Sequence, residues 1–129
     1  MSQENVDRLR AVYSEWEQGN LRAGEELYAE KATFVPMAEG REVLDRDGFR
    51  RFMHSFLTEW DDFTSEAVEM ADHGDKVLVT ERQRATGRGS GIQIDQLFYV
   101  VWTFRDGLVV HARWDSDHDE ARREAALPH

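Results

Sequence analysis

The sequence of 129 residues contains no cysteine, which excludes disulfides, thiolate metal sites and cysteine nucleophiles. It has no apolar run near the roughly 20 residues that a membrane-spanning helix needs, and its first residues are polar. Basic residues are scarce, 16 against 26 acidic ones, and the net charge of −10 opposes binding to nucleic-acid phosphates or anionic lipid. We therefore expect a cytoplasmic protein with no nucleic-acid or membrane partner, and a single domain over residues 1–129.

Residues of strand type are abundant between Asp75 and Asp117, where two turn signals divide them. The first turn is the glycine-rich sequence 87–91, since no helix or strand tolerates that density of glycine. The second is Asp106-Gly107, a pair that two-residue type I′ hairpins prefer. With a weaker strand before Asp75, four long antiparallel strands are predicted, at residues 63–71, 76–86, 92–105 and 108–116.

Apolar residues recur at helical spacing before this stretch and again after it. Pro36 ends a short strand-like run at residues 33–35, which favours the edge of a sheet for that run. The helices are expected to collect on one face of a curved antiparallel sheet, which is an α+β fold. They are predicted from the N-cap Ser2 to Gly19, at 22–29 with Leu27 and Tyr28 inward, after a cap at Asp45 or Asp47, and from Asp117 to about Leu127.

Five short motifs occur in an order and spacing that is typical of one protein family. They are Trp16-Glu17-Gln18-Gly19-Asn20, Glu39-Gly40-Arg41, Gly74-Asp75-Lys76-Val77, Thr86-Gly87-Arg88-Gly89-Ser90-Gly91 and Val101-Trp102-Thr103-Phe104-Arg105-Asp106-Gly107. With them, nearly the whole chain resembles the SnoaL-like branch of the nuclear transport factor 2-like superfamily. The resemblance implies a cone-shaped curved antiparallel sheet wrapped around helices, the cystatin-like α+β barrel. It also implies an apolar pocket inside the cone, and a homodimer.

The resemblance implies no single activity, because this superfamily includes isomerases, cyclases, epoxide hydrolases, dehydratases and non-catalytic modules. In the limonene epoxide hydrolases, which the chain also resembles, one arginine and two aspartates activate water. Arg82 matches that arginine, but Arg84 and Trp114 stand where the aspartates would be. Val100 stands where many SnoaL-like sequences have a histidine. The familiar acid-base positions are thus mostly filled by groups that accept no proton at neutral pH.

Alternation along the strands predicts which side chains face the pocket. In the last strand, Trp114 falls on the apolar, concave face, and Asp115 falls on the opposite face. In the strand at 76–86 we assign Arg82 and Arg84 to the pocket face. Arg82 is the expected polar anchor, because a guanidinium in an apolar site requires an acceptor that an oxygenated ligand can supply.

The third long strand is apolar on both faces, which has a consequence for assembly. Leu97, Tyr99 and Val101 alternate with the inward set that contains Phe98 and Trp102. A sheet that is apolar on both sides must be covered on both. We therefore predict a homodimer through the convex face.

The predicted pocket combines aromatic side chains with a few polar ones. Any single aromatic residue could pack in the core instead, and the arginines could pair with acidic neighbours such as Glu81, so the set as a whole indicates the pocket. The predicted lining consists of Tyr13, Trp16, Phe34, His54, Phe56, Arg82, Arg84, Phe98, Trp102 and Trp114. No cofactor or metal is expected, since the acidic cluster after residue 114 is explained as a helix cap.

Two classes of function stay open. The first is binding of a small hydrophobic, oxygenated molecule, polyketide-like or steroid-like, without catalysis. The second is an isomerase, cyclase or hydrolase that acts on such a molecule by proton transfer. A carboxylate or neutral imidazole inside the pocket would favour the enzyme, and its absence would favour the binding protein.

Overall fold

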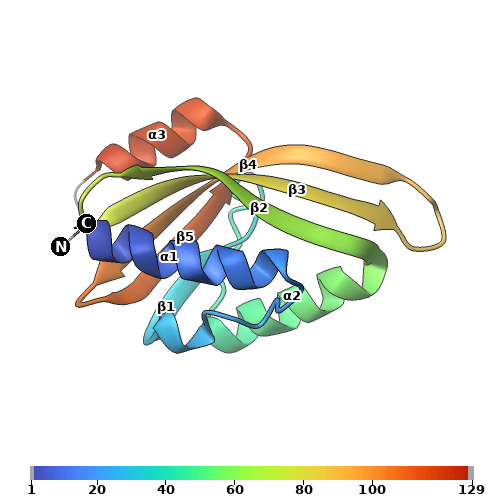
Figure 1. Cartoon of the computed structure of the whole chain (residues 1–129), viewed down its shortest axis with the longest axis horizontal. Helices are drawn as coiled ribbons and strands as arrows, with labels where there is room; N and C mark the ends of the chain where they lie inside the picture. The colour runs from blue at the N-terminus through green and yellow to red at the C-terminus, as the bar shows by residue number, and fades with distance from the viewer. Residues whose placement is uncertain (1, 128–129) are drawn as a thin grey trace.

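A computed structural model describes residues 2–127 and contains an α+β fold with one curved, unclosed five-stranded sheet. The strand order is β1-β5-β4-β3-β2, and all neighbours are antiparallel except β1 and β5. Figure 1 shows the sheet bending over α1 and α2, which gives it a concave and a convex face. The elements are α1 (Ser2–Glu17), a 3-10 turn (Glu25–Leu27), β1 (Tyr28–Val35), α2 (Arg46–Glu59), β2 (Trp60–Asp72), β3 (Lys76–Gly87), β4 (Gln93–Arg105), β5 (Leu108–Asp115) and α3 (His118–Ala126).

Local sequence signals explain most of these boundaries. Asp106 and Gly107 have φ of 53° and 79°, the left-handed pair that a two-residue type I′ turn between β4 and β5 requires. Asp45 caps α2 by accepting a hydrogen bond from the Gly48 amide, and Asp117 caps α3 in the same way. These turns and caps are confirmed as predicted. The cap predicted at Ser2 depends on the side chain of that residue, which is not among the described ones.

Two predicted boundaries are wrong. The helix expected at 22–29 shrinks to the 3-10 turn, and Tyr28 already begins β1. Gly24, with φ of 97°, precedes that turn, and its Cα lies so close to Val12 that a side chain there would clash, so the chain bends sharply here. Trp60 likewise leaves the helix that its spacing suggested and begins β2, which is longer than the strand predicted at 63–71.

The main core fills the concave face between the sheet and α1. Its fully buried members include Leu9 and Tyr13 of α1, with Trp102 at 1% exposure on β4. The tryptophan ring makes edge contacts with the rings of Tyr13 and Trp114. The prediction that Trp102 faces inward near the centre of the sheet is therefore confirmed.

The convex face carries a second, smaller core, which corrects the expectation that all helices lie on one side. Helix α3 packs there, and Figure 1 shows it on the side of the sheet opposite α2. Its Ala121 and Ala125 cover Leu78 and Val101. The buried Lys76 fixes the end of the helix by donating a hydrogen bond of 2.9 Å to the Glu124 carbonyl. The C-terminal helix thus covers part of the surface that was assigned to a second subunit.

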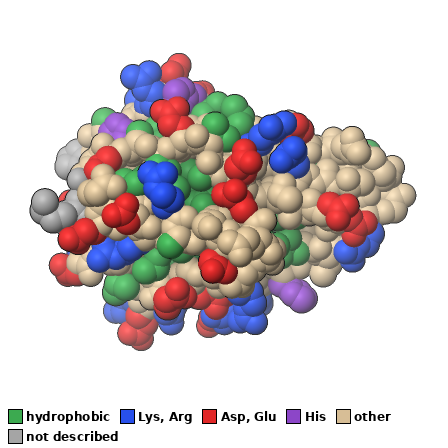
Figure 2. Space-filling view, viewed as in Figure 1, with side chains coloured by type: hydrophobic (Ala, Val, Ile, Leu, Met, Phe, Trp, Pro, Cys, Tyr) green, Lys and Arg blue, Asp and Glu red, His purple; other side chains and the backbone are tan. Residues whose placement is uncertain are grey.

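The surface carries charges of both signs. Acidic and basic side chains are interspersed over the face seen in Figure 2, with apolar side chains showing between them. Among residues 2–127, none of the helices combines the length and the apolarity needed to cross a bilayer.

Candidate functional site

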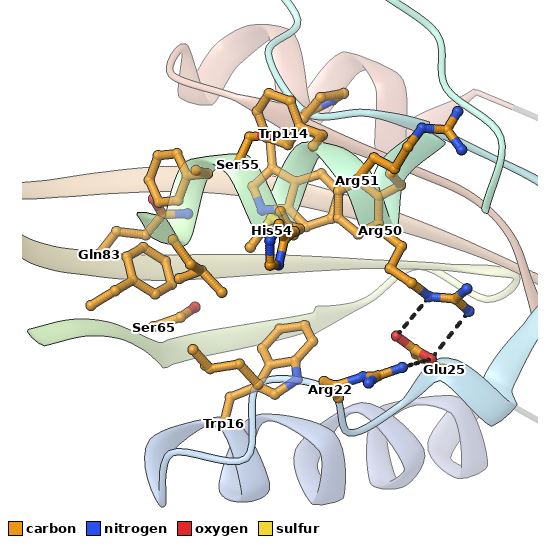
Figure 3. A pocket seen from close by; sticks show the side chains of 18 of the residues that line it. Trp16, Arg22, Glu25, Arg50, Arg51, His54, Ser55, Ser65, Gln83 and Trp114 are labelled. Carbon is orange, nitrogen blue, oxygen red and sulfur yellow. Dashed lines mark hydrogen bonds and ion pairs between the residues drawn. The ribbon is translucent and has the colours of Figure 1, made fainter. Parts of the chain in front are cut away.

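A cavity of about 790 Å³ lies between α2, the loop after α1 and the inner face of the sheet. Helix α2 contributes the largest share of its wall, because the apolar stripe of this helix faces the sheet without filling the space. Figure 3 shows Trp16 and Trp114 on opposite walls of the cavity. The aromatic lining consists of Trp16, Tyr28, Phe49, Phe52, Phe56, Phe63, Phe98 and Trp114.

A buried carboxylate, Glu81 of β3, lies in the wall of this cavity with 2% of its surface exposed. Its Oε2 accepts a hydrogen bond of 2.7 Å from the Tyr13 hydroxyl, which in turn accepts one of 3.2 Å from the Trp102 indole. Its Oε1 accepts hydrogen bonds from Gln83 Nε2 at 2.5 Å and from Trp114 Nε1 at 3.3 Å. Donors from α1, β3 and β5 thus converge on one carboxyl group.

The environment of Glu81 shifts its proton affinity in two opposing ways. Burial raises the pKa of this carboxyl above its usual range, because the charged form loses its hydration. The donors from Tyr13, Gln83 and Trp114 lower the pKa, since they stabilise the carboxylate, but burial is the larger effect. A carboxyl group whose pKa is raised by burial is a suitable group to accept a proton from a bound molecule and return it.

Two hydroxyl groups lie beside Glu81, that of Ser65 in the cavity wall and that of Tyr13 behind it. Burial raises the pKa of Tyr13 well above its ordinary value, so this phenol keeps its proton and remains a donor to Glu81. Ser65 on β2 is buried, and its proximity helps to lower the pKa of Glu81. Its Oγ nevertheless makes no hydrogen bond of good geometry among residues 2–127. The serine hydroxyl is therefore a further buried polar group of the wall, beside Glu81.

Arg82 and Arg84 lie on the opposite face of β3, so the prediction that they line the pocket is wrong. Arg82 forms a bidentate ion pair with Asp95, with distances of 2.8 and 2.6 Å, and Arg84 is exposed. The physical reason is the register of the sheet. Glu81 lies opposite Phe98 of β4, whose inward direction was correctly predicted, and cross-strand partners share a face. That pairing was the signal that could have identified Glu81.

Five of the ten predicted pocket residues line the cavity, and three others lie behind its wall. Tyr13, Phe34 and Trp102 are fully buried in the adjacent core, where they support the lining rather than form it. His54 is exposed on α2 and borders the cavity, as predicted. The lining members of the predicted set are Trp16, His54, Phe56, Phe98 and Trp114.

The acidic residues that follow β5 serve the backbone. Asp115 is buried and accepts a hydrogen bond from the Asp117 amide, and Asp117 caps α3. Within residues 2–127, no three His, Asp or Glu side chains are grouped closely enough to hold a metal ion. The polar residues that line the cavity are Glu81, Ser65, Gln83, His54, Ser55, Glu25 and the arginines Arg22, Arg46, Arg50 and Arg51.

Comparison with known structures extends the fold assignment. AclR from Streptomyces galilaeus superimposes with a TM-score of 0.76 at 15% identity, over 99% of this chain and 100% of its own. A protein named as a SnoaL-like polyketide cyclase from Jannaschia sp. CCS1 gives 0.76 at 16% identity, over 99% and 95%. TerC, co-crystallized with polyporic acid, gives 0.73 at 18%, over 96% and 98%. At these identities the likeness shows a common fold and no common activity.

None of the curated proteins matches this sequence. The family model of the SnoaL-like domain matches residues 9–112, which include β1 to β4 and α2 in full and α1 and β5 in part. The chain therefore belongs to the SnoaL-like domain family, within the nuclear transport factor 2-like fold.

Proposed function

We propose that this protein binds a small hydrophobic, oxygenated molecule, of the size of a polyketide or a steroid, in the cavity beside Glu81. The observation that carries the proposal is a buried carboxyl group in the wall of a largely apolar cavity of about 790 Å³. Such a volume is typical of small-molecule sites, in which an apolar wall supplies affinity and a few polar groups fix orientation. Each well-buried methylene of the ligand contributes about 0.8 kcal/mol.

Glu81 replaces Arg82 as the polar anchor, which changes the expected ligand. A carboxylate binds a donor, so the ligand would present a hydroxyl group or an acidic C–H rather than a carbonyl. Glu81 Oε2 accepts only the Tyr13 hydrogen bond among the described contacts and keeps a second lone pair. A ligand hydroxyl at this position would form a charge-assisted hydrogen bond in a site of low polarity.

Binding of naphthol and of its methyl ether tests this role, because the two molecules share a ring system and differ in the donor. Calorimetry should find naphthol bound about tenfold more tightly, the effect of one hydrogen bond to a charged group. Glu81→Gln should remove most of that preference and leave the affinity for the ether unchanged. Glu69→Gln, at an exposed site, is the matched control. Equal affinities in the wild type, or no binding of either molecule, would contradict the proposal.

The alternative function, acid-base catalysis by an isomerase, cyclase or hydrolase, gains support from the same residue. The sequence offered no proton acceptor at the familiar positions, and Glu81 is a buried carboxyl group whose pKa is raised by burial. It could remove a proton next to a carbonyl group of a bound molecule and return it elsewhere.

Deuterium exchange provides a direct measurement of this catalytic role. With tetralone as an apolar ketone probe, the protein should accelerate loss of the proton next to the carbonyl in heavy water, as followed by NMR. Glu81→Gln should abolish the acceleration. If the wild type binds the ketone without accelerating exchange, the binding function stands and proton abstraction from such ketones fails.

A homodimer through the convex face remains part of the proposal, on a smaller surface than the sequence suggested. Helix α3 covers Val101, but Val68 and Leu97 stay 55% and 43% exposed. An isologous contact over these residues would bury them. Sedimentation equilibrium at micromolar concentration should give a dimer mass, and Leu97→Glu should shift it towards the monomer. A monomer mass for the wild type would contradict the dimer, and the cytoplasmic location also stays a prediction.

A further inference from the structure

Four arginines, Arg22, Arg46, Arg50 and Arg51, line the same cavity and form what we call the cationic rim. Arg22, Arg50 and Arg51 are exposed, which places them where the cavity meets solvent. Figure 3 shows Arg50 and Arg22 beside Glu25 at one end of the cavity, with Ser65 and Gln83 towards the other end. The cavity therefore has a cationic end and a carboxylate end, in a chain whose net charge is −10.

The rim is not neutralised by its own neighbours. Glu25 is the only acidic residue in the lining besides Glu81, and it is shared by Arg22 at 3.7 Å and Arg50 at 3.3 Å. Arg50 has a further contact of 3.5 Å with Asp47. The other two arginines, Arg46 and Arg51, form no ion pair or side-chain hydrogen bond that is recorded among residues 2–127. Two guanidinium groups at the rim are thus free to bind an anion.

The position of these arginines on α2 is unfavourable for the helix itself. Arg46 and Arg50 are four residues apart, so that their like charges lie on neighbouring turns. Arg46 is also the first residue of α2, where the helix dipole disfavours a cation. An anion bound between these side chains would relieve both effects, because guanidinium groups match the geometry of carboxylate and phosphate oxygens.

We propose that the ligand is two-ended, with an apolar body in the aromatic cavity and an anionic group, a carboxylate or a phosphate, held by the cationic rim. The inference rests on the proposed function and specifies the ligand class of that same site. It also fixes the direction of binding, since the arginines lie at the mouth and an anion pairs with them there. The donor group of the ligand then meets Glu81, and its acidic group stays at the mouth.

Displacement of the neutral, apolar dye Nile red tests the inference with three competitors that share one alkyl chain. Decanol, decanoate and decyl phosphate, all below their micelle concentrations, differ only in the head group. For the wild type, at least one anionic competitor should displace the dye about tenfold better than decanol, the effect of one or two partly exposed ion pairs. The better of the two anions identifies the head group, and higher salt should reduce its advantage.

The variant that carries Arg46→Gln and Arg51→Gln should lose most of the anionic advantage, while decanol displaces the dye as before. The control carries Arg10→Gln and Arg122→Gln, which remove the same charge from exposed sites on α1 and α3. It should behave as the wild type does. The inference fails if decanol displaces the dye as well as both anions do, or if the anions keep their tenfold advantage in the Arg46→Gln and Arg51→Gln variant. In both cases the proposed binding of an apolar molecule in the cavity is retained. If Nile red does not bind at all, the proposed function fails and the inference fails with it.

Discussion

The concave face of the sheet has two halves that the same strands build in different ways. In the packed half, α1 lies against β2 and β3 and contacts Trp102 of β4 through Tyr13, and the side chains of this core are almost fully buried. In the hollow half, α2 stands over the other ends of β2, β3 and β4, and the cavity remains. The packed half is represented by Leu9, Val77, Val79, Trp102, Phe104 and Val109, and the hollow half by Phe52, Phe56, Phe63, Ser65, Glu81 and Phe98.

The difference shows how a single sheet can serve stability and binding at once. Both halves contain aromatic residues, so the presence of aromatic rings does not distinguish them. What differs is the presence of polar atoms that need partners: Glu81 and Ser65 lie where the aromatic rings leave space. Substitutions of the same kind should therefore cost stability in the packed half and alter ligand binding in the hollow half.

The largest effect is expected from Trp102→Ala in the packed half. Trp102 is 1% exposed, and its removal leaves a large void and takes away the hydrogen bond to the Tyr13 hydroxyl. The free energy of unfolding should fall by about 3–5 kcal/mol. Trp60→Ala, at the partly exposed start of β2, should cost less. Denaturant unfolding that ranked the two variants the other way would remove the distinction between the halves.

A smaller loss of stability is expected from Phe56→Ala in the hollow half. Phe56 is only half-buried and borders the cavity, so its removal should lower the free energy of unfolding by about 1 kcal/mol. Phe104→Ala, at 3% exposure in the packed half, is the matched control and should cost several times more. Phe56→Ala should also admit bulkier ligands, which calorimetry with ligands of graded size can measure. Equal losses of unfolding free energy from Phe56→Ala and Phe104→Ala would contradict the difference between the two halves.

The smallest effect concerns how stability varies with pH. Because burial raises the pKa of Glu81 above the ordinary 4.5, the folded state holds this proton to higher pH than the unfolded chain does. The contribution of Glu81 to stability is therefore complete below 4.5 and is lost as pH rises through the raised pKa. Glu81→Gln should lack this decrease, so that its stability relative to the wild type increases over that range. Chemical unfolding at a series of pH values measures the difference, and a constant difference would mean that the carboxyl group is not shifted.

The packed half could be predicted from the sequence, because its signals are local and agree with one another. Alternation along β4 correctly placed Phe98 and Trp102 inward, and Asp106-Gly107 correctly predicted the hairpin. The α+β fold and the family also followed from the sequence, since motif order reflects the order of the elements.

The polar part of the hollow half could not be predicted from β3 alone. Residues 80–84 around Glu81 are all polar, so alternation along the strand does not show which face is buried. Only the pairing of Glu81 with Phe98 of β4 decides it. Arg82 was chosen as the anchor because an oxygenated ligand can supply the acceptor that a guanidinium in an apolar site requires. Burial of an unpaired carboxylate is costly, and the donors that compensate this cost at Glu81 come from Tyr13 and Trp114, which are remote in sequence. The rim arginines were missed because exposed helix residues carry no periodic signal.

The hydrogen bonds around Glu81 also constrain when the site can form. The Tyr13–Glu81 bond joins residues 68 positions apart, and the Trp102–Tyr13 bond joins residues 89 positions apart. A site closed by contacts of such long range cannot exist in an N-terminal fragment, and proteins dominated by non-local contacts fold slowly, in milliseconds to seconds. On the ribosome, α1 must therefore wait for β4 before the carboxyl group is enclosed, so the ability to bind ligand arises among the last steps of folding.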